Sequence, residues 1–213
     1  MIVCWSIKGG SGTTVVSAAL ALSLAQRNNA PVRIVDLAGD IPSALGIAEP
    51  SSAGVSEWLT NETTEPLHGL QIPVTARVSL VPRGNAHLSH HQLSVEHCTR
   101  LATELDNLPQ LTVVDAGSGH IPQLIHHATT SLLVIRPCYL ALRKASQLTT
   151  KPHGIVLISE PGRSLGKKDV ESVIGAPVVA ELPLEPTIAR SVDAGLLASR
   201  IPAVLSQHLA HVA

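Results

Sequence analysis

Short runs of valine, isoleucine and leucine alternate along the chain with longer segments of helical periodicity. The runs are apolar at nearly every position, which is typical of strands buried on both faces of a parallel sheet. The expected strands are 2–7, 32–36, 78–82, 111–115, 131–137, 154–159 and 176–182. The expected helices are 14–27, 93–105, 139–148 and 167–175. This alternation predicts an α/β fold with a doubly wound, mostly parallel sheet flanked by helices.

The order of these elements also predicts where a ligand would bind. We expect the strands within 2–7, 32–36, 111–115, 131–136 and 154–159 to lie side by side and parallel. In such sheets, ligands bind at the carboxyl ends of the strands. The sequence has no internal repeat, low-complexity tract or linker, so we expect one domain over residues 1–213.

The composition of the chain argues against a nucleic-acid-binding, membrane-spanning or secreted protein. The formal net charge of −1 gives no overall attraction to nucleic acid or to an anionic membrane. The apolar run at 2–7 is too short for a signal peptide, and no run approaches the roughly 18 residues that cross a bilayer. The three cysteines, Cys4, Cys98 and Cys138, form no C-x-x-C pair. This usage favours a reducing, cytoplasmic compartment over a disulfide framework.

A glycine-rich loop follows the first expected strand and precedes the first expected helix. Glycines let consecutive backbone N–H groups point at an anion, and the helix N-terminus adds partial positive charge. The candidate ligand residues are Lys8, Gly9, Gly10, Ser11, Gly12, Thr13 and Thr14. The strict phosphate-loop pattern G-x-x-x-x-G-K-[ST] fails at Ile7 and at Thr13, which takes the lysine position. A strand–helix turn without a ligand is the alternative interpretation.

The loop resembles the deviant phosphate loop K-G-G-x-G-K-[ST]-[ST] of the MinD/ParA family of P-loop ATPases. The likeness continues through "VRIVDLAGDIPSALGI" (32–47), which resembles switch I, and "LTVVDAGSG" (111–119), which resembles the Walker B strand and switch II. Asp36 matches the first switch I aspartate, whereas Ala38 stands where the family has a second one. Within the family, the degenerate loop suggests the TadZ/CpaE-like or septum-site-determining branch, without a receiver domain in front.

The resemblance implies a site for ATP or ADP with Mg²⁺. Lys8 would match the signature lysine, which reaches the partner's phosphates across a dimer interface, and Asp40 is the candidate substitute for the missing aspartate. We therefore expect Lys8 and Asp40 to be the catalytic residues. The expected Mg²⁺ residues, acting mostly through water, are Thr13, Asp36 and Asp115. The expected base-binding residues are Glu160, Pro183, Leu184 and Glu185.

Two substitutions predict a weakened site. A lost charged hydrogen bond is worth about 1.5–3 kcal/mol, so Thr13 would weaken nucleotide binding without abolishing it. Hydrolysis would suffer more, because the missing charge acts on the transition state and Ala38 cannot orient water. We therefore expect slow or absent hydrolysis, with Asp40 or Lys8 as possible compensating groups.

These features lead to a functional hypothesis with rivals. The chain would be a nucleotide-linked homodimer that positions a cell-envelope, septum or pilus assembly partner, cytoplasmic and recruited to a pole or membrane by that partner. The first alternative is a pseudo-ATPase scaffold that dimerises without turnover. The second is a ParA-type DNA-partitioning ATPase, which the near-neutral charge disfavours. The apolar stripe within 200–213 lacks lysine and aromatic residues, so we expect it to pack on the sheet rather than to anchor the chain in a membrane.

A histidine-rich segment after the third expected strand offers possible metal ligands. Its residues are His87, His90, His91, His97 and Cys98. Imidazole and thiolate groups bind Zn²⁺, but this spacing follows no structural zinc pattern. A solvated loop is the favoured interpretation.

Overall fold

The computed structural model describes residues 1–86 and 92–212. At its centre is an eight-stranded sheet in the order β3-β4-β2-β5-β1-β6-β7-β8. The strands are β1 (Ile2–Trp5), β2 (Val32–Asp36), β3 (Ile72–Pro73), β4 (Val78–Val81), β5 (Leu111–Asp115), β6 (Thr130–Ile135), β7 (Gly154–Ser159) and β8 (Val178–Pro183). All neighbours pair in parallel except β3, which is antiparallel to β4. The predicted fold class is confirmed.

The predicted neighbours are also confirmed. The five strands β2, β5, β1, β6 and β7 are contiguous, and β1 pairs with β5. The continuous apolar character of these strands arises because helices cover both faces. The sequence did not predict β3, since two residues at a sheet edge leave no measurable periodicity.

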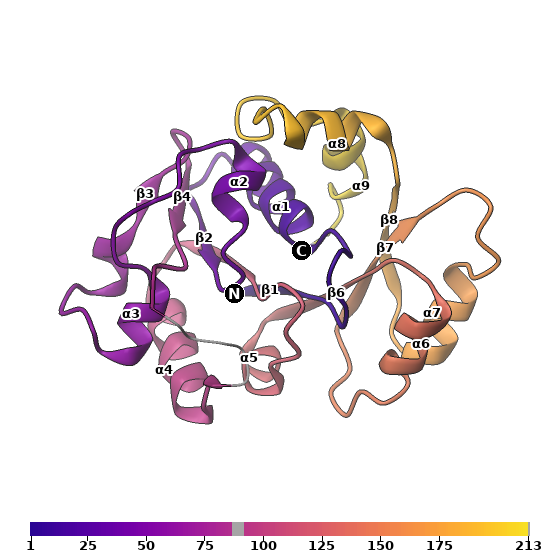
Figure 1. Ribbon diagram of the computed structural model, residues 1–213, viewed down its shortest axis with the longest axis horizontal. Helices are drawn as coiled ribbons and strands as arrows, with labels where there is room; N and C mark the ends of the chain where they lie inside the picture. Colours follow the sequence, from indigo (N-terminus) through magenta and orange to yellow (C-terminus); the bar gives the residue numbers. More distant parts are fainter. Residues whose placement is uncertain (87–91, 213) are drawn as a thin grey trace.

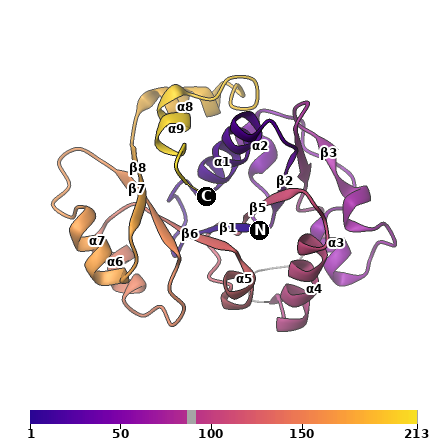
Figure 2. The same cartoon turned by 180° about the vertical axis from the view of Figure 1, so that it is seen from behind.

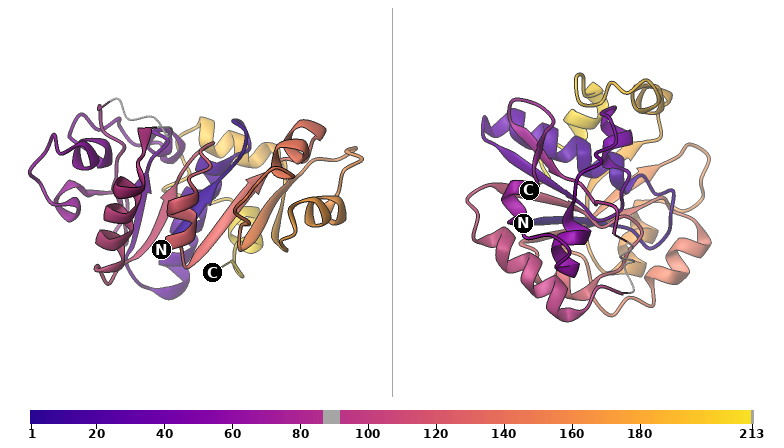
Figure 3. Two further views of the ribbon diagram at one scale, coloured as in Figure 1. Left: turned by 90° about the horizontal axis from the view of Figure 1, so that it is seen from below. Right: turned by 60° about the vertical axis from the view of Figure 1, so that its left-hand side comes forward.

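Helices pack on both sides of the sheet. They are α1 (Thr13–Asn28), α2 (Ile41–Leu45), α3 (Val55–Thr60), η1 (Leu67–Leu70), α4 (Val95–Asp106), α5 (Pro122–His127), α6 (Tyr139–Ala145), α7 (Lys167–Ile174), α8 (Pro186–Asp193) and α9 (Ala203–His208). Helices α1, α2, α8 and α9 lie over one face, and α4 to α7 lie over the other (Figures 1 and 2). Figure 3 shows the sheet running between these two layers.

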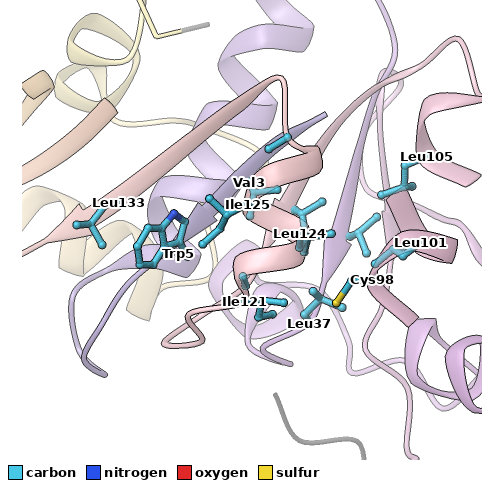
Figure 4. Packing of buried hydrophobic residues seen from close by; sticks show 14 of the residues in the cluster. Val3, Trp5, Leu37, Cys98, Leu101, Leu105, Ile121, Leu124, Ile125 and Leu133 are labelled. Atoms are coloured by element: carbon cyan, nitrogen blue, oxygen red, sulfur yellow. The ribbon is translucent and has the colours of Figure 1, made fainter. Parts of the chain in front are cut away.

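Each face of the sheet has its own apolar core. Helix α1 contributes small side chains such as Ala18 and Ala21, both fully buried, so its backbone lies close to the strands. On the opposite face, Trp5 belongs to a core that also holds Leu101 of α4 and Leu124 of α5 (Figure 4). Aliphatic side chains supply most of both cores, in keeping with the scarcity of aromatic residues in the sequence.

The C-terminal stripe packs as the sequence predicted. Leu205, Leu209 and Val212 are buried in the core that also holds α1, and α9 contacts α1 and β8. Within the described residues, no helix combines the length and apolarity that crossing a bilayer requires.

The carboxylate of Glu57 joins α3 to the segment after β4. Its Oε2 accepts a hydrogen bond from Gly54 N at 2.8 Å, and its Oε1 accepts from Asn85 N at 2.6 Å and Ala86 N at 2.8 Å. These backbone donors outweigh burial and lower the pKa of Glu57. Because the chain is so close here, a Cβ added at Gly54 would lie 2.2 Å from the carbonyl oxygen of Pro82.

This close approach gives a matched test. Gly54 and Gly166 are both helix N-caps with extended backbone and an acidic residue three positions on, but a Cβ at Gly166 meets nothing within 4 Å. We expect Gly54→Ala to lower the free energy of unfolding by about 1–3 kcal/mol more than Gly166→Ala, the usual range for overpacking. Urea denaturation of both variants measures the difference, and equal losses would contradict the clash.

Candidate functional site

The glycine-rich loop leaves β1 at the carboxyl edge of the sheet. Gly10 and Gly12 have φ angles of 75° and 85°, the left-handed region that glycine adopts without strain. The hydroxyls of Ser6 and Ser11 both donate to the carbonyl oxygen of Lys8, at 3.0 and 2.8 Å. Helix α1 begins directly after Gly12, so its free N–H groups and partial positive charge face the loop.

The loop leaves open space next to its backbone. A Cβ added at Gly9, Gly10 or Gly12 would meet no atom within 4 Å. At Gly9, φ lies outside the left-handed region as well, so neither backbone strain nor internal crowding requires glycine there. The close approach of a bound group to the backbone would account for glycine at this position.

Two buried carboxylates lie side by side beneath the loop. Asp36 and Asp115 are register partners across β2 and β5, and both are fully buried. Oδ1 of Asp36 accepts hydrogen bonds from Ala38 N at 2.9 Å and Gly39 N at 2.6 Å, and Oδ2 accepts from Ile41 N at 3.0 Å. Burial raises the pKa of Asp36, although these backbone hydrogen bonds act to lower it. Asp36 therefore shapes the segment after β2, with both of its oxygens already engaged.

In Asp115, only one of the two carboxylate oxygens accepts a hydrogen bond from the described residues. Its Oδ1 accepts from Gly117 N at 3.0 Å, whereas Oδ2 is buried without a hydrogen-bond partner among the described residues. Burial, reinforced by the charge of Asp36, raises the pKa of Asp115 to about 7, and the hydroxyls of Thr14 and Ser17 oppose this shift. A buried carboxylate oxygen without a partner, beside a hydroxyl, suits a hard cation such as Mg²⁺.

Six of the seven expected phosphate-loop residues, all except Lys8, line one polar pocket of about 290 Å³. Its lining residues are Ser6, Gly9, Gly10, Ser11, Gly12, Thr13, Thr14, Val15, Ala38, Asp40, Gly117 and Ser118. Asp40 is exposed and its side chain makes no capping bond to α2, so its carboxylate is available at this pocket. Lys8 is exposed and is not among the lining residues. Of the two threonines in this pocket, Thr14 rather than Thr13 has the hydroxyl that lowers the pKa of Asp115.

A second, mainly apolar pocket adjoins the first. Both pockets are lined by Gly10, Ser11, Gly12 and Val15. The other residues of the second pocket are Val16, Arg136, Ile158, Leu182, Pro183, Leu184, Glu185, Ile188, Ala189, Val192, Asp193 and Leu205. A polar pocket and an apolar pocket thus meet at the loop.

Three of the four expected base-binding residues line the apolar pocket, and the fourth does not. Pro183, Leu184 and Glu185 are there, whereas Glu160 is not among the lining residues. Instead, Oε2 of Glu160 accepts hydrogen bonds from Arg136 and Arg163, which lower its pKa.

Arg136 and the pocket face of α8 were not predicted from the sequence. Ile188, Ala189 and Val192 form an amphipathic stripe at helical spacing within 186–193, which the short length of the segment concealed. The signal for Arg136 was its position directly after an apolar strand, where side chains reach the carboxyl edge of the sheet.

The histidine-rich segment shows no metal site in its described part. His87, His90 and His91 lie outside the described residues. His97 accepts a hydrogen bond from Ser94 N at the start of α4, and Cys98 is buried in the core. Within 1–86 and 92–212, no three histidine, cysteine, aspartate or glutamate side chains form a group that could hold a metal ion.

Comparison with known proteins supports the fold. No protein-family model matches the chain, and neither does any curated protein. Among solved structures, a ParA family ATPase from Chlorobium tepidum TLS aligns with a TM-score of 0.77 at 18% identity, over 98% of this chain and 94% of that one. The chain has the MinD/ParA fold.

Two MinD structures agree with this result. The septum site-determining protein MinD from Pyrococcus horikoshii OT3, complexed with Mg-ADP, gives a TM-score of 0.77 at 18% identity over 98% and 91% of the two chains. The MinC:MinD cell division protein complex from Aquifex aeolicus gives 0.75 at 19% identity over 98% and 91%. At these identities the similarity establishes the fold alone.

The buried carboxylate pair predicts a pH-dependent stability. Because the folded pKa of Asp115 lies above its unfolded value near 4, the folded state binds more protons between these values. The free energy of unfolding contributed by this group therefore falls as pH rises from about 4 to about 7. We expect Asp115→Asn to raise that free energy at pH 8 by about 1–3 kcal/mol, because the amide removes a buried negative charge that burial and Asp36 both disfavour.

Asp40→Asn is the matched control, since Asp40 is an exposed acid of the same pocket. Its unfolding free energy should stay close to that of the parent in urea titrations at pH 5 and pH 8. A less stable Asp115→Asn variant at pH 8 would show that the ionised carboxylate stabilises the fold.

Proposed function

We propose that this protein is a MinD/ParA-like nucleotide switch that binds ATP or ADP with Mg²⁺ and positions a protein partner. The observation that carries the proposal is the junction of a polar and an apolar pocket at one glycine-rich loop. A nucleotide has the same division, with charged phosphates at one end and a flat apolar base at the other. The Pyrococcus horikoshii MinD structure, which has the same fold, is complexed with Mg-ADP.

The residues of the polar pocket suit phosphates and a cation. Backbone N–H groups of the loop and of the first turn of α1 would bind the phosphate oxygens. The Thr14 hydroxyl and, through water, Asp115 would hold Mg²⁺, with Asp36 keeping the neighbouring segment in place. The bound cation would neutralise phosphate charge. It would also give Asp115 the partner that its buried Oδ2 lacks.

We also propose that the protein hydrolyses ATP slowly or not at all. Thr13 stands in the polar pocket where a lysine would neutralise the β- and γ-phosphates, and Ala38 offers no group to orient water. Asp40 lies at the same pocket and is the remaining candidate for that role. These substitutions favour a switch that hydrolyses nucleotide slowly, or a scaffold without turnover, which is the second candidate function.

The proposed active unit is a homodimer formed through the nucleotide face. Lys8 supports it, because its side chain is exposed at the edge of the loop and takes part in none of the described salt bridges. Such a lysine can reach the phosphates of a facing copy. We further propose a cytoplasmic protein that a partner recruits to the cell envelope, the septum or a pilus, as in the TadZ/CpaE-like branch; the Aquifex MinD structure is itself a complex with MinC. The net charge of −1 disfavours DNA as the partner.

The dimer proposal rests on Lys8. We expect Mg-ATP to shift the parent from monomer to dimer in size-exclusion chromatography. Lys8→Ala should need at least ten times more ATP to dimerise to the same extent, because one charged contact per site is lost. Lys8→Arg, which keeps the charge, is the control. Normal dimerisation of Lys8→Ala would assign the lysine no role across the interface.

The hydrolysis proposal rests on Thr13 and Ala38. We expect the double change Thr13→Lys with Ala38→Asp to raise steady-state phosphate release at least tenfold above either single change. The lysine would act on transition-state charge, and the aspartate would hold water, so the two effects should be strongly non-additive. Rapid phosphate release by the parent would show that the present residues already form a competent site.

A further inference from the structure

Arg136 follows the last residue of β6 and reaches the edge of the loop. Strand β6 is the parallel neighbour of β1, so the chain after each strand emerges at the same edge of the sheet. The side chain of Arg136 is 39% exposed and lines the apolar pocket together with Gly10, Ser11 and Gly12. Among the described residues that line the two pockets, Arg136 is the only lysine or arginine.

The guanidinium is held by a carboxylate that has a second partner. Nε and Nη2 of Arg136 donate to Oε2 of Glu160 at 3.2 and 2.8 Å. Nη2 of Arg163 lies 2.8 Å from the same oxygen. When Arg136 leaves, Glu160 keeps Arg163, so no carboxylate is left unpaired. A more highly charged anion, such as a phosphate group, could therefore displace Glu160 from Arg136.

The polar pocket lacks the charge that such an anion needs. Thr13 is neutral, Asp40 adds a negative charge, and Lys8 does not line the pocket. Phosphate groups bind guanidinium in a two-pronged geometry that a carboxylate satisfies in the same way.

We propose that Arg136 supplies, within one chain, the positive charge that Thr13 does not, exchanging Glu160 for the nucleotide phosphates. The inference rests on the proposed nucleotide site and names its phosphate-binding cation. Arg136 is then a specificity residue, because it favours ligands with more phosphates over the nucleoside. In this proposal Glu160 binds Arg136 when no nucleotide is present, rather than binding the base.

The test compares ligands with and without phosphates. Calorimetric titrations would use ATP with Mg²⁺, and adenosine, on the parent, Arg136→Gln and the control Arg163→Gln. We expect Arg136→Gln to weaken ATP about ten- to a hundredfold and to leave adenosine unchanged, as for one lost charged hydrogen bond. Arg163→Gln should leave both affinities within about twofold, since Arg163 does not line the pocket.

Two further variants sharpen the result. Arg136→Lys keeps the charge and should retain most of the ATP affinity, which separates charge from folding defects. In a Thr13→Lys background, Arg136→Gln should cost at least threefold less than in the parent, because the two cations then serve the same phosphates.

The possible outcomes distinguish a failure of the Arg136 proposal from a failure of the proposed nucleotide site. Equal loss of ATP and adenosine affinity, or no loss at all, overturns the role of Arg136 while the nucleotide site stands. A folded parent that binds neither ATP nor ADP overturns the proposed function and this inference together.

Discussion

The site depends on two acids that the parallel sheet forces together. Asp36 and Asp115 are paired in register across β2 and β5, and Asp115 is also paired with Cys4 of β1, so the ends of the central strands meet in a buried polar spot. Neither acid can move away without breaking the register of an apolar sheet. The fold therefore holds a charge conflict directly beneath the loop, and a cation at Asp115 would relieve it.

The surrounding structure is organised around this spot. Both oxygens of Asp36 are used to hold the backbone of Ala38, Gly39 and Ile41, which brings Ala38 and Asp40 to the polar pocket. Helix α8 and the end of β8 form the apolar pocket on the other side of the loop. The phosphate end and the base end of the proposed ligand would thus share one element, the loop between β1 and α1.

Strand identity and order could be predicted from the sequence because two-sided burial makes a strand apolar at every position. The loop follows such a strand, and the resemblance to the MinD/ParA family pointed to Asp36, Asp115 and Pro183 to Glu185, each of which also follows or ends a strand. Short elements such as β3 and α2 leave too few residues for a periodic signal. Which threonine hydroxyl lies near Asp115, and the hydrogen bond of Arg136 to Glu160, depend on side-chain directions that spacing along the chain does not fix.

The central claim is that this loop binds a nucleotide although the phosphate-loop lysine is replaced by Thr13. A calorimetric titration of the purified chain with ATP, in the presence and absence of Mg²⁺, tests it most directly. We predict saturable binding of one ATP per chain that is at least tenfold tighter with Mg²⁺ than without, because the cation would relieve the buried charge at Asp115. A folded protein that binds neither ATP nor ADP, with or without Mg²⁺, would contradict it.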